Sequence, residues 1–271
     1  MNPPVSEEQK SFAWLSCILD TLRQQCPWDS KQTPESLRHL TIEEIYELSE
    51  ALLEHDTEST RKELGDILMH VIFYSKLFAD AGAFTTVDMI DTICHKLISR
   101  HPHISLPDRD GIMQAASTLE APQWEQVKMK ENRRSVLEGV PHTLPPLVKA
   151  VRMHNKVAGV GFDFESANEA KCKVDEEYRE LQEALCHPDN QAHVQEEFGD
   201  LLFALVVWGN HLGVNADDAL SLTINKFRQR FAHVEQTAIS QGRTIADLSP
   251  DEMLALWQEA KNHPQPQINT P

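Results

Sequence analysis

The sequence is poor in several residue types, and each shortage excludes a class of protein. It has only 10 glycines and 5 cysteines in 271 residues. The cysteines are odd in number and form no CxxC pair, so we expect free thiols, buried or inert, in a reducing compartment. The longest apolar run, residues 201–208, is too short to span a bilayer. Residues 1–8 lack a basic segment followed by an apolar one, so we expect no signal peptide and a cytoplasmic protein.

Basic residues are also scarce relative to acidic ones. The chain has 25 Lys and Arg against 42 Asp and Glu, a net charge of −17. Such a charge repels nucleic acid phosphates and anionic lipid surfaces, so neither is an expected partner. The acid excess therefore either covers a solvated surface or gathers carboxylates that bind metal ions.

The sequence does contain one pattern written twice. An EExxE motif begins at Glu43 and again at Glu176, and an ExxD motif begins at Glu63 and again at Glu197. Further landmarks recur in the same order, 130 to 134 residues apart: Lys96 and Arg100 with Lys226 and Arg230, Trp124 and Lys128 with Trp257 and Lys261, and Trp28-Asp29 with Phe162-Asp163. We therefore expect two copies of one domain at 10–130 and 145–262, a linker at 131–144 and a polar tail at 263–271.

Each copy is predicted to be helical. Apolar residues recur at helical spacing at Ile45, Leu48 and Leu52, and at Tyr178, Leu181 and Leu185. The alternation of apolar and polar residues that is typical of β-strands is absent. The sequence therefore predicts an all-α fold built from antiparallel helix pairs. Thr41 with Glu44 fits a capping box that opens the first motif helix. Residues 187–190 indicate a turn between the second copy's motif helices, and the apolar stretch after each ExxD predicts a buried helix.

The two motifs of each copy predict a group of carboxylates. On a helical wheel Glu176 and Glu180 share one face, and Glu177 lies beside the apolar stripe. Antiparallel packing against ExxD would gather four or five carboxylates, whose repulsion a divalent cation relieves. Oxygen ligands favour Mg²⁺ or Mn²⁺ over zinc, and carboxylate-bound Mg²⁺ usually serves phosphate chemistry.

Phosphate chemistry also requires cations. Lys226 and Arg230 stand four residues apart on one predicted helix, and Trp257 and Lys261 pair an aromatic face with a cation. Taken alone, a Lys and Arg pair of this kind is usually surface charge, and the Trp and Lys pair is more often a packed Trp beside an exposed Lys.

In this order the motifs resemble the MazG family of all-α nucleoside triphosphate pyrophosphohydrolases. EExxE and ExxD are separated by 15 residues in the first copy and 16 in the second. Residues 26–29, 100–103 and 159–163 are similar to tandem two-domain members. The resemblance implies Mg²⁺-dependent hydrolysis of a broad range of NTPs and dNTPs to monophosphate and pyrophosphate. Water would attack the α-phosphorus, and two subunits of a homodimer would complete each helical bundle.

The resemblance also implies residue roles, mainly in the C-terminal copy. The implied metal ligands are Glu177, Glu180, Glu197 and Asp200. The implied catalytic residues are the helper carboxylate Glu176 and the phosphate contacts Lys226 and Arg230, with Trp257 and Lys261 binding substrate. A possible second metal site comprises Glu44, Glu47, Glu63 and Asp66.

Some positions depart from the family pattern. Ile224 stands where the family often has Asn, with Asn225 one position later, so no Asn role is assigned. His70 occupies the place of Ala204 and is expected to be packed or hydrogen-bonded rather than a ligand. His101 and His103 are expected to be surface imidazoles in a loop.

Other functions stay open at this point. A narrower dUTP or dCTP pyrophosphatase would use the same motifs, as would a non-catalytic, nucleotide-binding regulatory dimer, although the retained acids and cations argue against the latter. A di-iron bundle is disfavoured because the candidate helices lack Glu-x-x-His. The motifs account for ten of the 42 acidic residues, so two metal sites would explain most of the charge excess.

Overall fold

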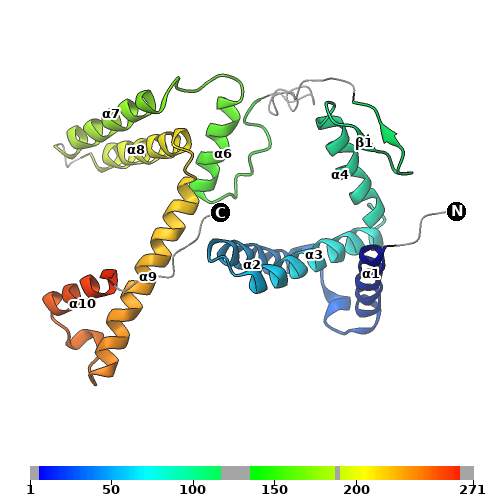
Figure 1. Ribbon diagram of the computed structural model, residues 1–271, viewed down its shortest axis with the longest axis horizontal. Helices are drawn as coiled ribbons and strands as arrows, with labels where there is room; N and C mark the ends of the chain where they lie inside the picture. The colour runs from blue at the N-terminus through cyan, green and yellow to red at the C-terminus, as the bar shows by residue number, and fades with distance from the viewer. Residues whose placement is uncertain (1–5, 117–134, 187–189, 263–271) are drawn as a thin grey trace. The chain divides into compact units, whose positions relative to one another are not determined.

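A computed structural model describes residues 6–116, 135–186 and 190–262, and confirms the all-α fold (Figure 1). The chain divides into two compact units, with residues 6–116 in the first and the later described residues in the second. The first unit contains α1 (Glu7–Gln25), η1 (Asp29–Lys31), α2 (Pro34–Leu53), α3 (Thr57–Asp80), α4 (Thr86–Arg100) and the two-residue strands β1 (Leu106–Pro107) and β2 (Met113–Gln114). The second contains α6 (Pro146–Ala158), α7 (Ala167–Leu185), α8 (Gln191–His211), α9 (Ala216–Ser240), η2 (Ile245–Asp247) and α10 (Pro250–Asn262).

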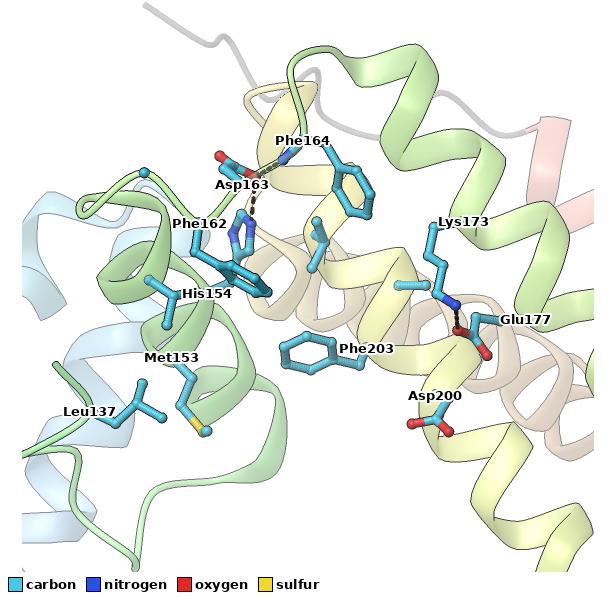
Figure 2. A pocket seen from close by; sticks show the side chains of 14 residues that line it. Leu137, Met153, His154, Phe162, Asp163, Phe164, Lys173, Glu177, Asp200 and Phe203 are labelled. Atoms are coloured by element: carbon cyan, nitrogen blue, oxygen red, sulfur yellow. Dashed lines mark hydrogen bonds and ion pairs between the residues drawn. The ribbon is translucent and has the colours of Figure 1, made fainter. Parts of the chain in front are cut away.

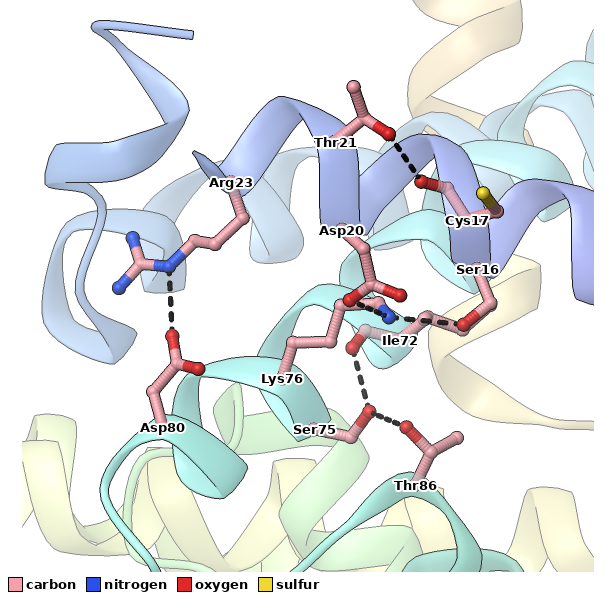
Figure 3. Close-up of polar contacts among 10 residues, drawn as sticks. All are labelled: Ser16, Cys17, Asp20, Thr21, Arg23, Ile72, Ser75, Lys76, Asp80 and Thr86. Atoms are coloured by element: carbon pink, nitrogen blue, oxygen red, sulfur yellow. Dashed lines mark hydrogen bonds and ion pairs between the residues drawn. The ribbon is translucent and has the colours of Figure 1, made fainter. Parts of the chain in front are cut away.

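The first unit is built on the α2–α3 hairpin, against which α1 packs. Leu19, Leu37, Ile72, Phe73 and Leu77 form its core. Polar contacts fasten the neighbouring helices around this core: α3 lysine and aspartate side chains pair with α1, and an α3 serine hydroxyl meets an α4 threonine (Figure 3). Helix α3, which carries the first ExxD, is thereby held on two sides.

The prediction of a capping box at Thr41 is wrong, because helix α2 begins earlier in the sequence. Thr33 is the N-cap, Ser36 completes the reciprocal pair, and Pro34 occupies the first turn. Thr41 lies inside the helix. Its hydroxyl is within hydrogen-bond distance of the Leu37 carbonyl oxygen and of the His70 ring on α3. Two Thr-led capping patterns stand close together in the sequence, and the one that includes proline starts the helix.

The second unit repeats the hairpin as α7 and α8. Ser166 caps α7 and Asn190 caps α8. Helix α6 packs against α8, and α10 packs against α9 around Val234, Ala238 and Leu248. The predicted turn at 187–190 lies outside the described residues apart from Asn190.

The apolar helices that follow ExxD are buried on one face only, so the prediction of full burial is wrong. Their other face carries large apolar side chains that are 37–54% exposed, at equivalent positions in the two copies: Leu64, Leu68 and Val71 on α3, and Phe198, Leu202 and Leu205 on α8. We call these six residues the repeated apolar face. Composition predicted how apolar these helices are, but not that a single chain leaves one face uncovered.

The five cysteines are free, as expected, but none is buried: Cys26 is half-buried and the others are exposed. No helix among the described residues is long and apolar enough to cross a membrane. The repeat landmarks Trp124 and Lys128 lie outside the described residues.

Candidate functional site

The α7–α8 hairpin brings the second copy's acidic motifs together. Glu177, Glu197 and Asp200 each offer an oxygen, and these atoms all lie within 4.8 Å of one another. Glu176, Glu177 and Glu180 form an overlapping group on the same criterion. Glu177 is only 6% exposed, because its helical position turns it toward α8, as the wheel predicted.

Lys173, which was not among the predicted site residues, neutralises part of this group. Its ammonium nitrogen lies 2.7 Å from Glu176 Oε1 and 2.7 Å from Glu177 Oε1. The hydrogen bond from Lys173 holds the pKa of Glu176 below its usual value. The two carboxylates in turn raise the pKa of Lys173. Its spacing, three and four residues before the two glutamates, was the signal that could have identified it.

Among the described residues, no cation forms an ion pair with Glu180. Desolvation, and then the negative charges of Glu177, Glu176 and Glu197, raise its pKa. A crowded group of carboxylate oxygens with one member resisting ionisation fits a hard divalent cation such as Mg²⁺ or Mn²⁺.

The first copy gathers its acids in the same way. Glu44, Glu47 and Glu63 offer oxygens within 4.8 Å of one another. Glu63 is buried, and its Oε2 has no hydrogen-bond partner among the described residues. Burial, the charge of Asp66 and the neighbouring Glu63 raise the pKa of Glu44. This group also fits a divalent cation.

His70 is packed and hydrogen-bonded, as predicted. Its Nδ1 lies 2.8 Å from Thr41 Oγ1, which in turn lies 2.9 Å from the Tyr74 hydroxyl. Burial lowers the pKa of His70, although the charge of Asp66 opposes the shift. His101 and His103 are half-buried rather than fully on the surface, which corrects that expectation.

The candidate cations of the second copy form a group of their own on α9 and α10. The guanidinium carbon of Arg230 lies 5.9 Å from the centre of the Trp257 ring, and that ring lies 4.9 Å from Phe227. Lys226 and Lys261 are exposed. Within the part of the chain that the structure describes, no hydrogen bond or ion pair joins these residues to the α7–α8 carboxylates.

A cavity of about 520 Å³ adjoins the carboxylates of the second copy. Figure 2 shows Lys173, Glu177 and Asp200 at one end and the phenyl rings of Phe162 and Phe203 farther in. This cavity is not predictable from the sequence, because its walls come from α6, α7, α8 and the loop between α6 and α7.

Asp163 anchors that loop. Its Oδ1 accepts hydrogen bonds from His154 Nε2 at 3.0 Å, His211 Nε2 at 2.9 Å and the Phe164 backbone N–H at 2.9 Å. Asn210 Nδ2 lies 3.1 Å from His154 Nδ1. Both histidine rings are therefore oriented by the same carboxylate, and the two phenylalanines that flank Asp163 are held beside the cavity.

The chain is similar to known proteins of one family. Residues 32–105 and 165–235 match the MazG nucleotide pyrophosphohydrolase domain, and the two segments contain both pairs of acidic motifs. The chain is 36% identical over 255 residues to the nucleoside triphosphate pyrophosphohydrolase of Escherichia coli K12, covering 91% of this chain and 95% of that protein.

Two further relatives extend the comparison. The chain is 35% identical over 255 residues to the nucleoside triphosphate pyrophosphohydrolase/pyrophosphatase MazG of Thermotoga maritima, covering 92% of this chain and 95% of that protein. It is 39% identical over 267 residues to the uncharacterized protein YabN of Bacillus subtilis, covering 96% of this chain but only 54% of YabN.

Proposed function

The chain belongs to the MazG family, and from this we propose that it hydrolyses nucleoside triphosphates to monophosphate and pyrophosphate, with Mg²⁺ and with a broad range of bases and sugars. The observation that carries the proposal is the α7–α8 carboxylate group, which joins both acidic motifs within 4.8 Å. The relatives from E. coli and T. maritima, which carry this activity in their names, support it along nearly their full length.

We assign the metal to Glu177, Glu180, Glu197 and Asp200, because these residues supply only oxygen ligands from two facing helices. Mg²⁺ held by these residues would polarise phosphate oxygens and lower the pKa of water. Mn²⁺ has the same preference for oxygen and is expected to substitute.

We propose that side chains of the protein accept the proton of the attacking water and bind the phosphates. Water attacks the α-phosphorus. The bond between the α-phosphorus and the oxygen that bridges it to the β-phosphorus breaks, and pyrophosphate leaves with the electron pair. Glu176, whose pKa the hydrogen bond from Lys173 holds below its usual value, is proposed to accept the proton of the water, with Glu180 as the alternative acceptor. Lys226, Arg230 and Lys261 are proposed to bind the phosphates, which requires dimerisation or substrate binding to bring them to the carboxylates.

We further propose a homodimer. The repeated apolar face is uncovered on both helix pairs of the described chain, and contiguous exposed apolar surface marks interaction sites. In a two-fold symmetric dimer each subunit uses the same surface, so the repeated apolar face of one subunit would be covered by the other.

The test is product analysis with Mg²⁺ across ATP, GTP, CTP, UTP and the corresponding dNTPs. The wild-type chain should release monophosphate and pyrophosphate from all of them, and chelation of the metal should abolish release. Asp200→Asn and Glu197→Gln should each lower kcat by at least about 100-fold, the scale of loss of a charged catalytic group.

The first-copy changes Asp66→Asn and Glu63→Gln are the matched controls, with circular dichroism to verify folding. If only these controls lose activity, the assignment to the second copy is wrong. Turnover of a single pyrimidine dNTP would instead establish a narrow pyrophosphatase. Absence of pyrophosphate from every substrate would establish a regulatory protein.

A further inference from the structure

A further cluster of metal-ligating side chains lies in the second unit, apart from the acidic motifs. His154 on α6, Asp163 in the loop after α6 and His211 on α8 each offer a ligand atom, and these atoms all lie within 4.8 Å of one another. The two imidazoles give this cluster a different chemistry from the carboxylate groups, because nitrogen ligands suit zinc and other transition metals better than Mg²⁺.

We propose that His154, Asp163 and His211 form a binding site for a divalent transition metal ion such as Zn²⁺, with a fourth position open toward the cavity. The ligands are none of the residues to which hydrolysis is assigned, so the proposal does not depend on the proposed function. An ion held there would cross-link α6, the loop after it and α8.

The distances fit a tetrahedral ion. The Nε2 atoms of His154 and His211 lie 3.0 Å and 2.9 Å from Asp163 Oδ1. Zinc bonds of about 2.0 to 2.1 Å at tetrahedral angles separate neighbouring ligand atoms by roughly 3.3 Å. Each nitrogen would therefore move away from the carboxylate by only about 0.3 to 0.4 Å to admit the ion.

The outer contacts of the cluster also suit a metal site. A histidine that binds metal through Nε2 carries its proton on Nδ1 and needs an acceptor there. The Asn210 amide lies 3.1 Å from His154 Nδ1, and a half-turn of that amide would present its oxygen in place of its nitrogen. The Phe164 backbone N–H, 2.9 Å from Asp163 Oδ1, orients the carboxylate (Figure 2).

Access and selectivity follow from the surroundings of the cluster. His154 is buried, whereas the Asp163 side chain is 28% exposed, and both line the cavity. An ion can therefore enter from the cavity, where a water molecule can complete its coordination. Mg²⁺ favours the carboxylate groups, which offer more negative charge and only oxygen, and a softer ion favours the imidazoles.

The first copy does not repeat this set of ligands. At the spacing of 134 residues that relates the acidic motifs, Asp29 corresponds to Asp163, but Leu77 corresponds to His211. Leu77 belongs to the apolar core of the first unit. We therefore expect one such site per chain, in the second unit.

The experiment measures Zn²⁺ binding to the full chain by calorimetry, in excess Mg²⁺ that occupies the carboxylates. The wild type should bind one Zn²⁺ per chain. His154→Gln and His211→Gln each keep a hydrogen-bond donor for Asp163 but remove a metal ligand. Each should weaken binding by more than about 100-fold, because loss of an outer-shell partner alone costs about 10-fold to 100-fold. Asn210→Ala, which removes such a partner, should weaken binding by about 10-fold to 100-fold.

Two control variants separate this site from other histidines and from the carboxylates. His95→Gln changes an exposed histidine on α4, and Asp200→Asn changes the carboxylate group of the second copy. Both should bind Zn²⁺ as the wild type does. Circular dichroism and metal-free thermal unfolding verify that every variant is folded.

Co²⁺ in place of Zn²⁺ reports the ligand atoms in the unaltered protein. Tetrahedral Co²⁺ with nitrogen and oxygen ligands gives intense visible bands, whereas thiolate ligands add a charge-transfer band in the near ultraviolet. The wild type should show the visible bands alone, which would exclude its five free cysteines as ligands. This spectrum tests the proposal even if a histidine variant fails to fold.

Three results would overturn the proposal. Zn²⁺ binding that survives both histidine changes would show that these rings only hold Asp163 by hydrogen bonds, as would absence of Zn²⁺ and Co²⁺ binding. Binding that is lost in Asp200→Asn but kept in His211→Gln would place the ion at the carboxylates. Pyrophosphate release is measured separately, so a chain that binds Zn²⁺ through its histidines but hydrolyses no nucleotide would refute only the proposed function.

Discussion

At the residue scale, Asp163 combines three hydrogen bonds on one carboxylate oxygen. Burial raises its pKa, but hydrogen bonds from His211, His154 and the Phe164 N–H outweigh burial and leave the pKa below the ordinary value of 3.8. A lowered carboxyl pKa stabilises the fold above the unfolded-state pKa, and that contribution disappears as the pH falls through the folded-state pKa.

Asp163→Asn should therefore destabilise the second unit by about 2 kcal/mol near pH 7, the scale for hydrogen bonds to a charged acceptor. Urea unfolding of both proteins from about pH 7 downward checks this. The difference should hold until the pH approaches the unfolded-state pKa of Asp and then shrink as the pH falls further. A difference that grows with acidity would contradict the assignment.

Lys173 should matter most when no metal is bound. Lys173→Met removes the cation that pairs with Glu176 and Glu177, so the melting temperature without divalent cations should fall. Added Mg²⁺ should then raise it by more than in the wild type, because the metal relieves a larger repulsion.

The control for this change is Lys171→Met, which breaks only an exposed pair with Asp175 and should alter neither melting temperature measurably. Thermal unfolding with and without Mg²⁺ measures all three proteins. Equal responses of the two variants to Mg²⁺ would show that Lys173 is an ordinary surface cation.

At the element scale, the two threonines of α2 have different roles. Thr33→Ala removes the N-cap and should cost about 1 kcal/mol. Thr41→Val keeps the shape but leaves His70 and Tyr74 without their shared hydroxyl, which should cost about 1 to 3 kcal/mol.

Urea unfolding and the helical circular dichroism signal separate the two effects. Thr33→Ala should also reduce the helical signal by fraying the first turn, and Thr41→Val should not. If Thr41→Val reduced the helical signal and Thr33→Ala did not, α2 would begin at Thr41 instead of Thr33.

Helix content was predictable because the spacing of apolar residues repeats at 3.6 residues per turn in both copies. The same periodicity turned Glu177 inward and brought the motifs together. The start of α2 was not predictable from the capping pattern alone, since Thr33 and Thr41 each offer a capping side chain and neighbouring residues decide between them. The cavity was not predictable because the small size of Ala204 and Val207 has meaning only once α6 and its loop pack opposite.

At the scale of the whole molecule, the repeated apolar face predicts association. The wild-type chain should sediment as a dimer, and Leu202→Glu should shift it toward monomer, because a charge would be buried without a partner. Analytical ultracentrifugation over a concentration series measures the dissociation constant.

Ile239→Glu is the control, since Ile239 is 70% exposed on α9 and lies outside the repeated apolar face. It should leave the dimer intact. A monomeric wild-type chain, or equal effects of the two changes, would reject this face as the interface.

The sequence by itself determined the family, the helical class, the duplication and the grouping of acids, because all four depend on residue type and spacing along one chain. Part of its acid excess is concentrated in two carboxylate groups rather than spread over the surface. Only the tertiary structure decided that one face of α3 and α8 stays uncovered and that a cavity opens beside one acidic group. Those features depend on which side chains of separate helices meet, and side-chain volumes across an interface leave no periodic signal in the sequence.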